Sequence, residues 1–182
     1  DGPEQEKIED IIKEHDLSAR VNMLGRLPNK EVIEFYKTWY IDIFIKISTS
    51  EGLPVSIMEA QSFGMPVIAT DVGGTREIVN ENTGWLIDSD VTAQYLAQSI
   101  KKMIELTPEE QKMMRENARN FWEKNFNAAT NYKDFYQNVL DFGWNNDYFL
   151  EGMKLPRKEW ELRIGLYITA LGPGGAERVV SR

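Results

Sequence analysis

Two glutamates, Glu51 and Glu59, are the residues in this chain whose setting most suggests chemistry. They lie in the stretch from 48 to 79, which reads STSEGLPVSIMEAQSFGMPVIATDVGGTREIV, with seven residues between them. The first follows a β-rich segment and sits in a loop that contains glycine and proline, and the second falls in the first turns of the helix predicted next. A carboxylate at such a place can grip sugar hydroxyls or stabilise positive charge at a reacting carbon.

The loop around Glu51 has the features of an anion site. The apolar segment 41–47 predicts a buried strand, and its carboxyl end delivers this loop to the edge where open α/β sheets bind ligands. Gly52 lets backbone approach a ligand closely, and a helix that begins near Pro54 presents unpaired N–H groups that attract phosphate. Since proline has no N–H, the available donors are those of Gly52, Leu53, Val55 and Ser56.

Each of these features also has a purely structural explanation. Ser56 and Glu59 fit the spacing of a capping box, in which the glutamate satisfies an N–H at the helix start. Gly73 and Gly74 fit a tight turn that requires positive φ, whether or not they contact a ligand. Lys46 adjoins the loop, but its place in a strand leaves its direction open. Spacing alone therefore favours the structural explanation for Glu59.

Strand-like and helix-like segments alternate over residues 1 to about 142. Strands are predicted at 19–25, 41–47, 66–70 and 83–87, helices at 4–16, 29–40, 55–64 and 91–106, and a short helix at 75–79. Asn29 is a candidate N-cap, and Thr107 followed by Pro108 and two acids is a strong helix start. The helix after Asn127 is expected to bury Tyr132, Phe135, Tyr136, Val139 and Leu140. This order predicts an α/β fold of three layers, Rossmann-like, with a mostly parallel open sheet closed by C-terminal helices.

Composition excludes several classes of protein. The 182 residues are 42% hydrophobic and 27% charged, as in ordinary globular proteins, and contain no cysteine for disulfides or thiolate metal sites. The net charge of −8 argues against nonspecific binding to nucleic acid. The single histidine, His15, lies among charged residues at a predicted helix end, so a histidine-based metal site is not expected. No apolar run approaches the length of a membrane span.

The order EGLP, MEA, GMPVIATDVGG and EIV resembles the C-terminal domain of the retaining GT-B glycosyltransferases of family four, also called glycosyl transferases group 1. Residues 1–4 resemble the end of that family's G-D-G-P turn, and VNMLGRLPNKEVIEFYKTWYIDIFIKIS resembles the segment that follows it. The resemblance covers residues 1 to about 140. It implies the C-terminal half of a GT-B fold and transfer of a sugar from a nucleotide sugar with retention of configuration.

The resemblance also implies roles for individual residues. Glu51 is expected to be the catalytic residue that contacts the transferred sugar, and Glu59 to bind the ribose of the donor. Two further segments complete the expected donor site. They are the backbone of Gly52, Leu53, Pro54, Val55 and Ser56, and the turn at Gly73 and Gly74. No cofactor or metal is expected, because helix N-terminus and basic side chains take the diphosphate charge. In the family, the Arg and Lys that neutralise the diphosphate precede the G-D-G-P turn, and these two residues lie outside this chain.

The partners implied are a nucleotide sugar such as a UDP- or GDP-sugar and a glycan or lipid-linked acceptor, with no nucleic acid. A hexosyltransferase of polysaccharide biosynthesis, cytoplasmic, fits best, and peripheral association with the inner face of the membrane through the N-terminal domain stays open. A piece limited to this donor half is expected to be inactive alone. The alternatives are a non-catalytic nucleotide-binding or interaction domain and another GT-B-like enzyme, an epimerase or a phosphorylase.

The last forty residues break the pattern. We predict a donor domain at 1–142, a linker at 143–160 and, at 161–182, the start of a second Rossmann-like unit. RIGLYITALGPGGAERVV resembles the first strand, glycine loop and helix of a family-four N-terminal domain, with Gly174 and Gly175 in the loop. A generic strand-to-helix turn explains these glycines equally well. Either a second transferase follows the first in tandem, or RIGLYIT fills the sheet position of the family's strand that would precede Asp1.

Overall fold

The computed structural model describes residues 2–145. The chain divides into two compact units, Asp1–Tyr136 and Gln137–Arg182. Most of the predicted linker at 143–160 and the whole predicted second unit at 161–182, with Gly174 and Gly175, lie outside the described residues. These predictions therefore stay predictions.

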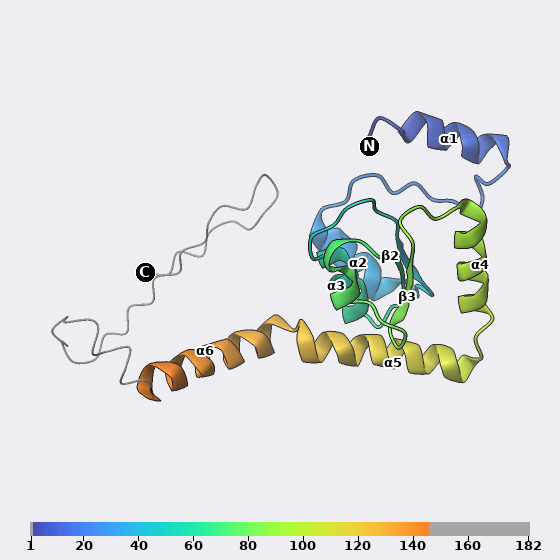
Figure 1. The fold of residues 1–182 in the computed structure, drawn as a ribbon. Helices are drawn as coiled ribbons and strands as arrows, with labels where there is room; N and C mark the ends of the chain where they lie inside the picture. Colours follow the sequence, from blue (N-terminus) through green and yellow to red (C-terminus); the bar gives the residue numbers. More distant parts are fainter. Residues whose placement is uncertain (1, 146–182) are drawn as a thin grey trace. The chain divides into compact units, whose positions relative to one another are not determined.

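A parallel sheet forms the centre of the first unit (Figure 1). Its strands are β1 (Phe44–Lys46), β2 (Val67–Thr70) and β3 (Gly84–Ile87), in that spatial order. The register pairs Lys46 with Ala69, so the two strands end close to one another. The predicted parallel α/β fold is confirmed, and three of the four predicted strands form.

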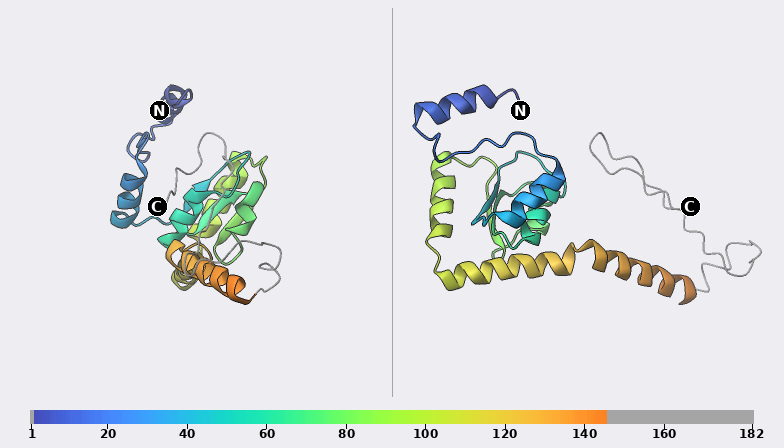
Figure 2. Two further views of the ribbon diagram at one scale, coloured as in Figure 1. Left: turned by 90° about the vertical axis from the view of Figure 1, so that its left-hand side faces the viewer. Right: turned by 180° about the vertical axis from the view of Figure 1, so that it is seen from behind.

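All four residues of β2 are buried, and alternate side chains of a strand point to opposite faces of the sheet. β2 therefore contributes to a hydrophobic core on each face. On one face Val67 and Ala69 pack with Ile57 of α3 (Val55–Ser62). On the other, Ile68 packs with Met103 of α4 (Ala93–Ile104). Figures 1 and 2 show α3 and α4 on opposite sides of the sheet, which gives the three layers predicted from the sequence.

Short signals in the sequence set several helix ends. α5 (Pro108–Asn125) begins with a full capping box, in which Thr107 Oγ1 accepts from the backbone N–H of Glu110 and the Glu110 carboxylate accepts from the N–H of Thr107. This backbone hydrogen bond, and then the one from the Thr107 hydroxyl, lowers the pKa of Glu110 below its usual value. Gly64, with φ of 69°, ends α3. The short helix predicted at 75–79 forms two residues earlier, as the 3₁₀ helix η1 (Gly73–Glu77), which includes both glycines of the turn.

The prediction of a strand at 19–25 is wrong. These residues have no strand structure, and Val21, Met23 and Leu24 are exposed. A strand needs a neighbour for its backbone hydrogen bonds, and within residues 2–145 the sheet contains only β1, β2 and β3. The apolar alternation of this segment is real, but nothing in the described part of the chain pairs with it.

Two predictions about the outer helices are also wrong. α2 (Asn29–Thr38) starts at Asn29 as predicted, but Pro28 is its N-cap and Asn29 caps nothing. α6 (Ala128–Asn145) forms, yet Tyr132, Phe135 and Tyr136 are exposed instead of buried, because no described element covers them. Of the other two residues in that prediction, Val139 is partly buried and the burial of Leu140 is not described. α1 (Gln5–Glu14) likewise has no buried residue. Among the helices of residues 2–145, none combines the length and apolar character that crossing a membrane requires.

Candidate donor-binding site

The loop after β1 and the turn after β2 are joined through their backbones. The N–H of Gly74 donates to the carbonyl oxygen of Gly52 at 2.8 Å. Gly73 has φ of 53°, and a Cβ there would overlap the carbonyl oxygen of Glu51 and lie 2.8 Å from its carbonyl carbon. Only glycine combines this conformation with so close an approach. The structure therefore brings Glu51, Gly52, Gly73 and Gly74 together, and the turn supports the loop.

A threonine for which the sequence predicted no role holds the start of this loop. Thr70, the last residue of β2, is buried, and its hydroxyl donates to the carbonyl oxygen of Ser48 at 2.7 Å. The same hydroxyl accepts from the N–H of Ser48 at 3.0 Å. The sequence did contain a signal for this role, a polar residue at the end of an apolar strand. A buried hydroxyl needs hydrogen-bond partners, so such a residue is expected to bind neighbouring backbone.

Glu51 is fastened to the strand that leads into the loop. Its Oε1 atom lies 2.9 Å from the ammonium of Lys46, and the two side chains are only 21% and 28% exposed. The hydrogen bond from Lys46, and then that from the Ser48 side chain, lowers the pKa of the Glu51 carboxyl below its ordinary value. At neutral pH Glu51 is therefore a fixed carboxylate at the carboxyl end of β1.

The start of α3 lies directly after Glu51. The helix begins at Val55 with Pro54 as N-cap, and no side chain caps it. The N–H of Ile57 is already bonded to Pro54, whereas the first helical N–H groups, of Val55 and Ser56, have no partner within the helix. Pro54 is buried while Gly52, Leu53 and Val55 are exposed. The predicted anion-binding donors thus stand at the surface beside Glu51.

Glu59 is not a helix cap. Because Pro54 is the N-cap, Ser56 lies inside the helix and the capping-box explanation is wrong. Instead Oε1 of Glu59 accepts from Nδ2 of Asn29 at 2.6 Å, which ties the start of α2 to α3. Burial, and then the nearby Glu59 carboxylate, raises the pKa of the Tyr36 hydroxyl. The role of Asn29 was missed, because a contact across 30 residues leaves no local signal.

An ion pair follows β2 at the rim of the site. Arg76 Nη2 lies 2.7 Å from Oδ2 of Asp71, and Nε donates to Oδ1 at 3.0 Å, so the pair is bidentate. The hydrogen bond and charge of Asp71 raise the pKa of Arg76. Within residues 2–145 no group of three or more His, Cys, Asp or Glu side chains is arranged to hold a metal ion.

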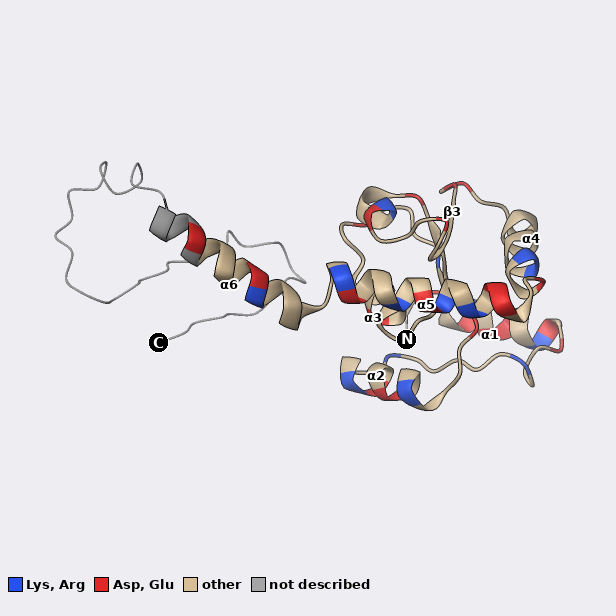
Figure 3. Cartoon of the chain, turned by 90° about the horizontal axis from the view of Figure 1, so that it is seen from below, with Lys and Arg blue, Asp and Glu red and all other residues tan. Residues whose placement is uncertain are grey.

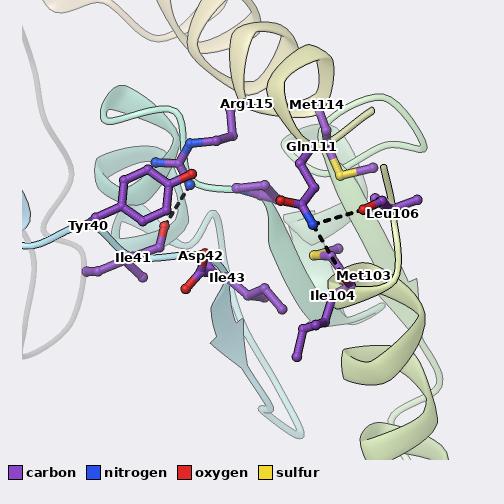
Figure 4. Close-up of a pocket in the computed structure, with 11 residues that line it drawn as sticks. Tyr40, Ile41, Asp42, Ile43, Met103, Ile104, Leu106, Gln111, Met114 and Arg115 are labelled. Carbon is purple, nitrogen blue, oxygen red and sulfur yellow. Dashed lines mark hydrogen bonds between the residues drawn. The ribbon is translucent and has the colours of Figure 1, made fainter. Parts of the chain in front are cut away.

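A cavity of about 560 Å³ lies elsewhere, where the chain enters β1 (Figure 4). Its lining includes Tyr40, Ile43, Met103 and Arg115, and neither Glu51 nor Glu59 belongs to it. Arg115 donates to the carbonyl oxygen of Ile41 at 2.7 Å and stacks over the Tyr40 ring. These contacts fix the entry to β1 and so the position of the strand that carries Lys46.

The site residues stand in the part of the chain that matches a family model. Residues 1–121 match the model described as glycosyl transferases group 1. The chain belongs to this family. Its fold matches part of a GT-B glycosyltransferase, as the sequence predicted, and the match covers 76% of this chain and 35% of the solved chain.

Individual relatives agree with this assignment. The chain is 32% identical over 108 residues to a component of the phosphatidylinositol N-acetylglucosaminyltransferase of Arabidopsis thaliana, covering 59% of this chain and 23% of the relative. It is 31% identical over 133 residues to the putative colanic acid biosynthesis glycosyltransferase WcaL of Escherichia coli, covering 69% of this chain and 32% of the relative. The chain therefore spans a third or less of the length of these curated relatives.

A solved structure supports the fold independently. Anabaena HepE in complex with UDP superposes with a TM-score of 0.60 at 26% identity, covering 76% of this chain and 38% of HepE. A nucleoside diphosphate is thus bound by a protein of this fold.

Proposed function

We propose that this chain supplies the donor-binding half of a glycosyltransferase that moves a sugar from a nucleotide sugar to a glycan or lipid-linked acceptor. One observation carries the proposal. The Glu51 loop, the free start of α3 and the Gly73–Gly74 turn converge at the carboxyl ends of β1 and β2. Ligands of open α/β sheets bind at this edge.

The chemistry of each group suits one part of the donor. The N–H groups at the start of α3 suit the diphosphate, since a helix N-terminus attracts phosphate. Glu51, ionised and held by Lys46, suits a hydroxyl of the transferred sugar. Glu59 has Oε1 occupied by Asn29 and keeps Oε2 to accept from the ribose hydroxyls. The binding of UDP by HepE supports a uridine nucleotide as one candidate donor.

Transfer would proceed with retention of configuration through an oxocarbenium-like state. As the bond from the sugar to the diphosphate breaks, positive charge grows on the anomeric carbon, and a fixed carboxylate nearby stabilises that charge. The start of α3 takes up part of the negative charge on the departing diphosphate. Because the chain spans at most a third of the relatives' length, we expect the acceptor side to lie outside it and the 182-residue chain alone to show no useful turnover.

The proposed roles of Glu51 and Glu59 predict different effects of substitution, and one experiment distinguishes them. Nucleoside diphosphates and nucleotide sugars of the uridine, guanosine and adenosine series are titrated into the full-length protein and its Glu51→Gln and Glu59→Gln variants. Glu59→Gln should weaken binding of the diphosphate and of the nucleotide sugar alike, by about tenfold. Glu51→Gln should leave diphosphate affinity unchanged and lower kcat/KM for the sugar donor by about a hundredfold.

Glu81→Gln, at an exposed position away from both loops, is the matched control and should behave as wild type. The anomeric configuration of the product, followed by proton NMR at early times, tests retention. Wild-type binding to no member of the nucleotide panel, or indifference of binding and turnover to both glutamate variants, would refute the proposed function.

A further inference from the structure

Lys46 is an unusual residue for its place. It ends β1 between Ile45 and Ile47, in a segment that is otherwise almost continuously apolar. Strands of parallel sheets favour apolar residues, and a half-buried ammonium loses part of its hydration. A charge at this position needs a compensating partner, and the partner is Glu51 at 2.9 Å.

The Lys46–Glu51 pair differs from the other ion pairs of residues 2–145. It is the one in which both side chains are less than a third exposed. The pairs within α5 and at the end of α4 are at the surface, and Figure 3 shows positively and negatively charged residues interspersed along α5. Exposed pairs contribute little to stability, and a pair that loses hydration on partial burial is often no more stable than apolar side chains of the same size. Stability alone therefore does not account for this pair.

We propose that Lys46 is a positioning residue for Glu51, which it holds by Oε1 so that Oε2 is left to accept from a hydroxyl of the donor sugar. The inference rests on the proposed function and deepens it. The loop is then fixed at three points: Ser48 to Thr70, Glu51 to Lys46, and Gly52 to Gly74. Of these three contacts, the one from Lys46 acts on the carboxylate itself, and the Ser48 side chain adds a weaker effect on the same carboxylate.

The other charged groups near the loop belong to the segment after β2. On the side of the turn, Glu77 Oε1 lies 3.6 Å from where a Gly74 Cβ would stand, and Asp71 is paired with Arg76. Lys46 is the charged group that lowers the pKa of Glu51. Glu51 is active as a carboxylate, so activity is lost as pH falls through this lowered pKa. Without Lys46 the pKa of Glu51 rises, and the acid limb of the pH profile moves to higher pH.

The test uses Lys46→Met and Lys46→Gln in the full-length protein, with Lys46→Arg as the conservative variant. Lys112→Met, which removes one charge from an exposed pair on α5, is the matched control. The measurements are the affinities for the nucleotide sugar that the wild type binds best and for its nucleoside diphosphate, kcat/KM against pH, and the melting temperature. Two uncharged variants are included so that a folding defect in one does not decide the result.

We expect Lys46→Met and Lys46→Gln to lower kcat/KM by about tenfold to a hundredfold, with unchanged diphosphate affinity and an acid limb moved to higher pH. Lys46→Arg should restore most of the activity. Because Lys46→Met and Lys46→Gln leave the partly buried Glu51 carboxylate without its partner, the melting temperature of both should fall modestly. An equal loss of affinity for the diphosphate would mean that Lys46 binds the diphosphate directly, and an unmoved acid limb would mean that it does not act on Glu51. Either result overturns the inference while the proposed function stands; failure of the wild type to bind any nucleotide sugar overturns both.

Discussion

The turn at Gly73 supports the loop that carries Glu51, and replacing this glycine with alanine tests that support directly. An alanine Cβ would overlap the carbonyl oxygen of Glu51 and come within 2.8 Å of its carbonyl carbon, at a residue with φ of 53°. An L-residue in the left-handed region costs about 1 to 2 kcal/mol. Overpacking against backbone adds about 1 to 3 kcal/mol, so Gly73→Ala should lower the free energy of unfolding by about 2 to 5 kcal/mol.

Gly25→Ala provides the control for conformation. Gly25 has φ of 64°, and nothing lies within 4 Å of the position its Cβ would take. The free energy of unfolding of this variant should therefore fall only by the cost of positive φ, about 1 to 2 kcal/mol. Its donor binding should equal that of the wild type. The difference between the two variants measures the clash with the Glu51 loop, and urea unfolding followed by tryptophan fluorescence provides both values.

The same clash predicts a functional effect. To relieve it, the backbone of Glu51 must move by roughly 1 Å, and displacements of that size cost about a hundredfold in catalytic efficiency. In the full-length protein, Gly73→Ala should therefore lower kcat/KM far more than Gly25→Ala does. Equal unfolding free energies for the two variants, or wild-type turnover in Gly73→Ala, would refute the contact between turn and loop.

Four further predictions follow from individual contacts. Thr70→Val leaves the N–H and carbonyl of Ser48 without their partner and should lower the free energy of unfolding by about 2 kcal/mol in urea denaturation; an unchanged midpoint would count against the link. Asn29→Ala should weaken nucleoside diphosphate binding by severalfold in calorimetry, but not when Glu59 is already alanine, because Asn29 acts through that carboxylate. Thr107→Ala removes the capping box of α5 and should cost about 1 kcal/mol of stability with donor affinity unaltered; a change in affinity would show that α5 reaches the site. Donor binding should survive chelation of divalent cations, and its loss in EDTA would contradict the assignment of the diphosphate charge to helix N-terminus and basic side chains.

The sequence was sufficient for the elements that depend on local signals and on a buried central strand. The apolar runs of β1, β2 and β3, the cap at Thr107 and the glycine that ends α3 each act within a few residues. For the same reason the candidate site could be located: its loop, helix start and glycine turn are contiguous in the stretch 48–79. The order of these residues also placed the chain in its family.

Tertiary structure decided what depends on partners distant in sequence. The segment 19–25 has the alternation of a strand, but a strand forms only where a neighbour accepts its hydrogen bonds. Glu59 has the spacing of a cap, yet Asn29, 30 residues away, takes its carboxylate. The sequence did not show to which face of the sheet the Lys46 side chain points, because successive side chains of a strand point to opposite faces. Only the fold brings its ammonium to Glu51. Residue types determined which chemistry was available, and long-range packing determined which of those groups meet.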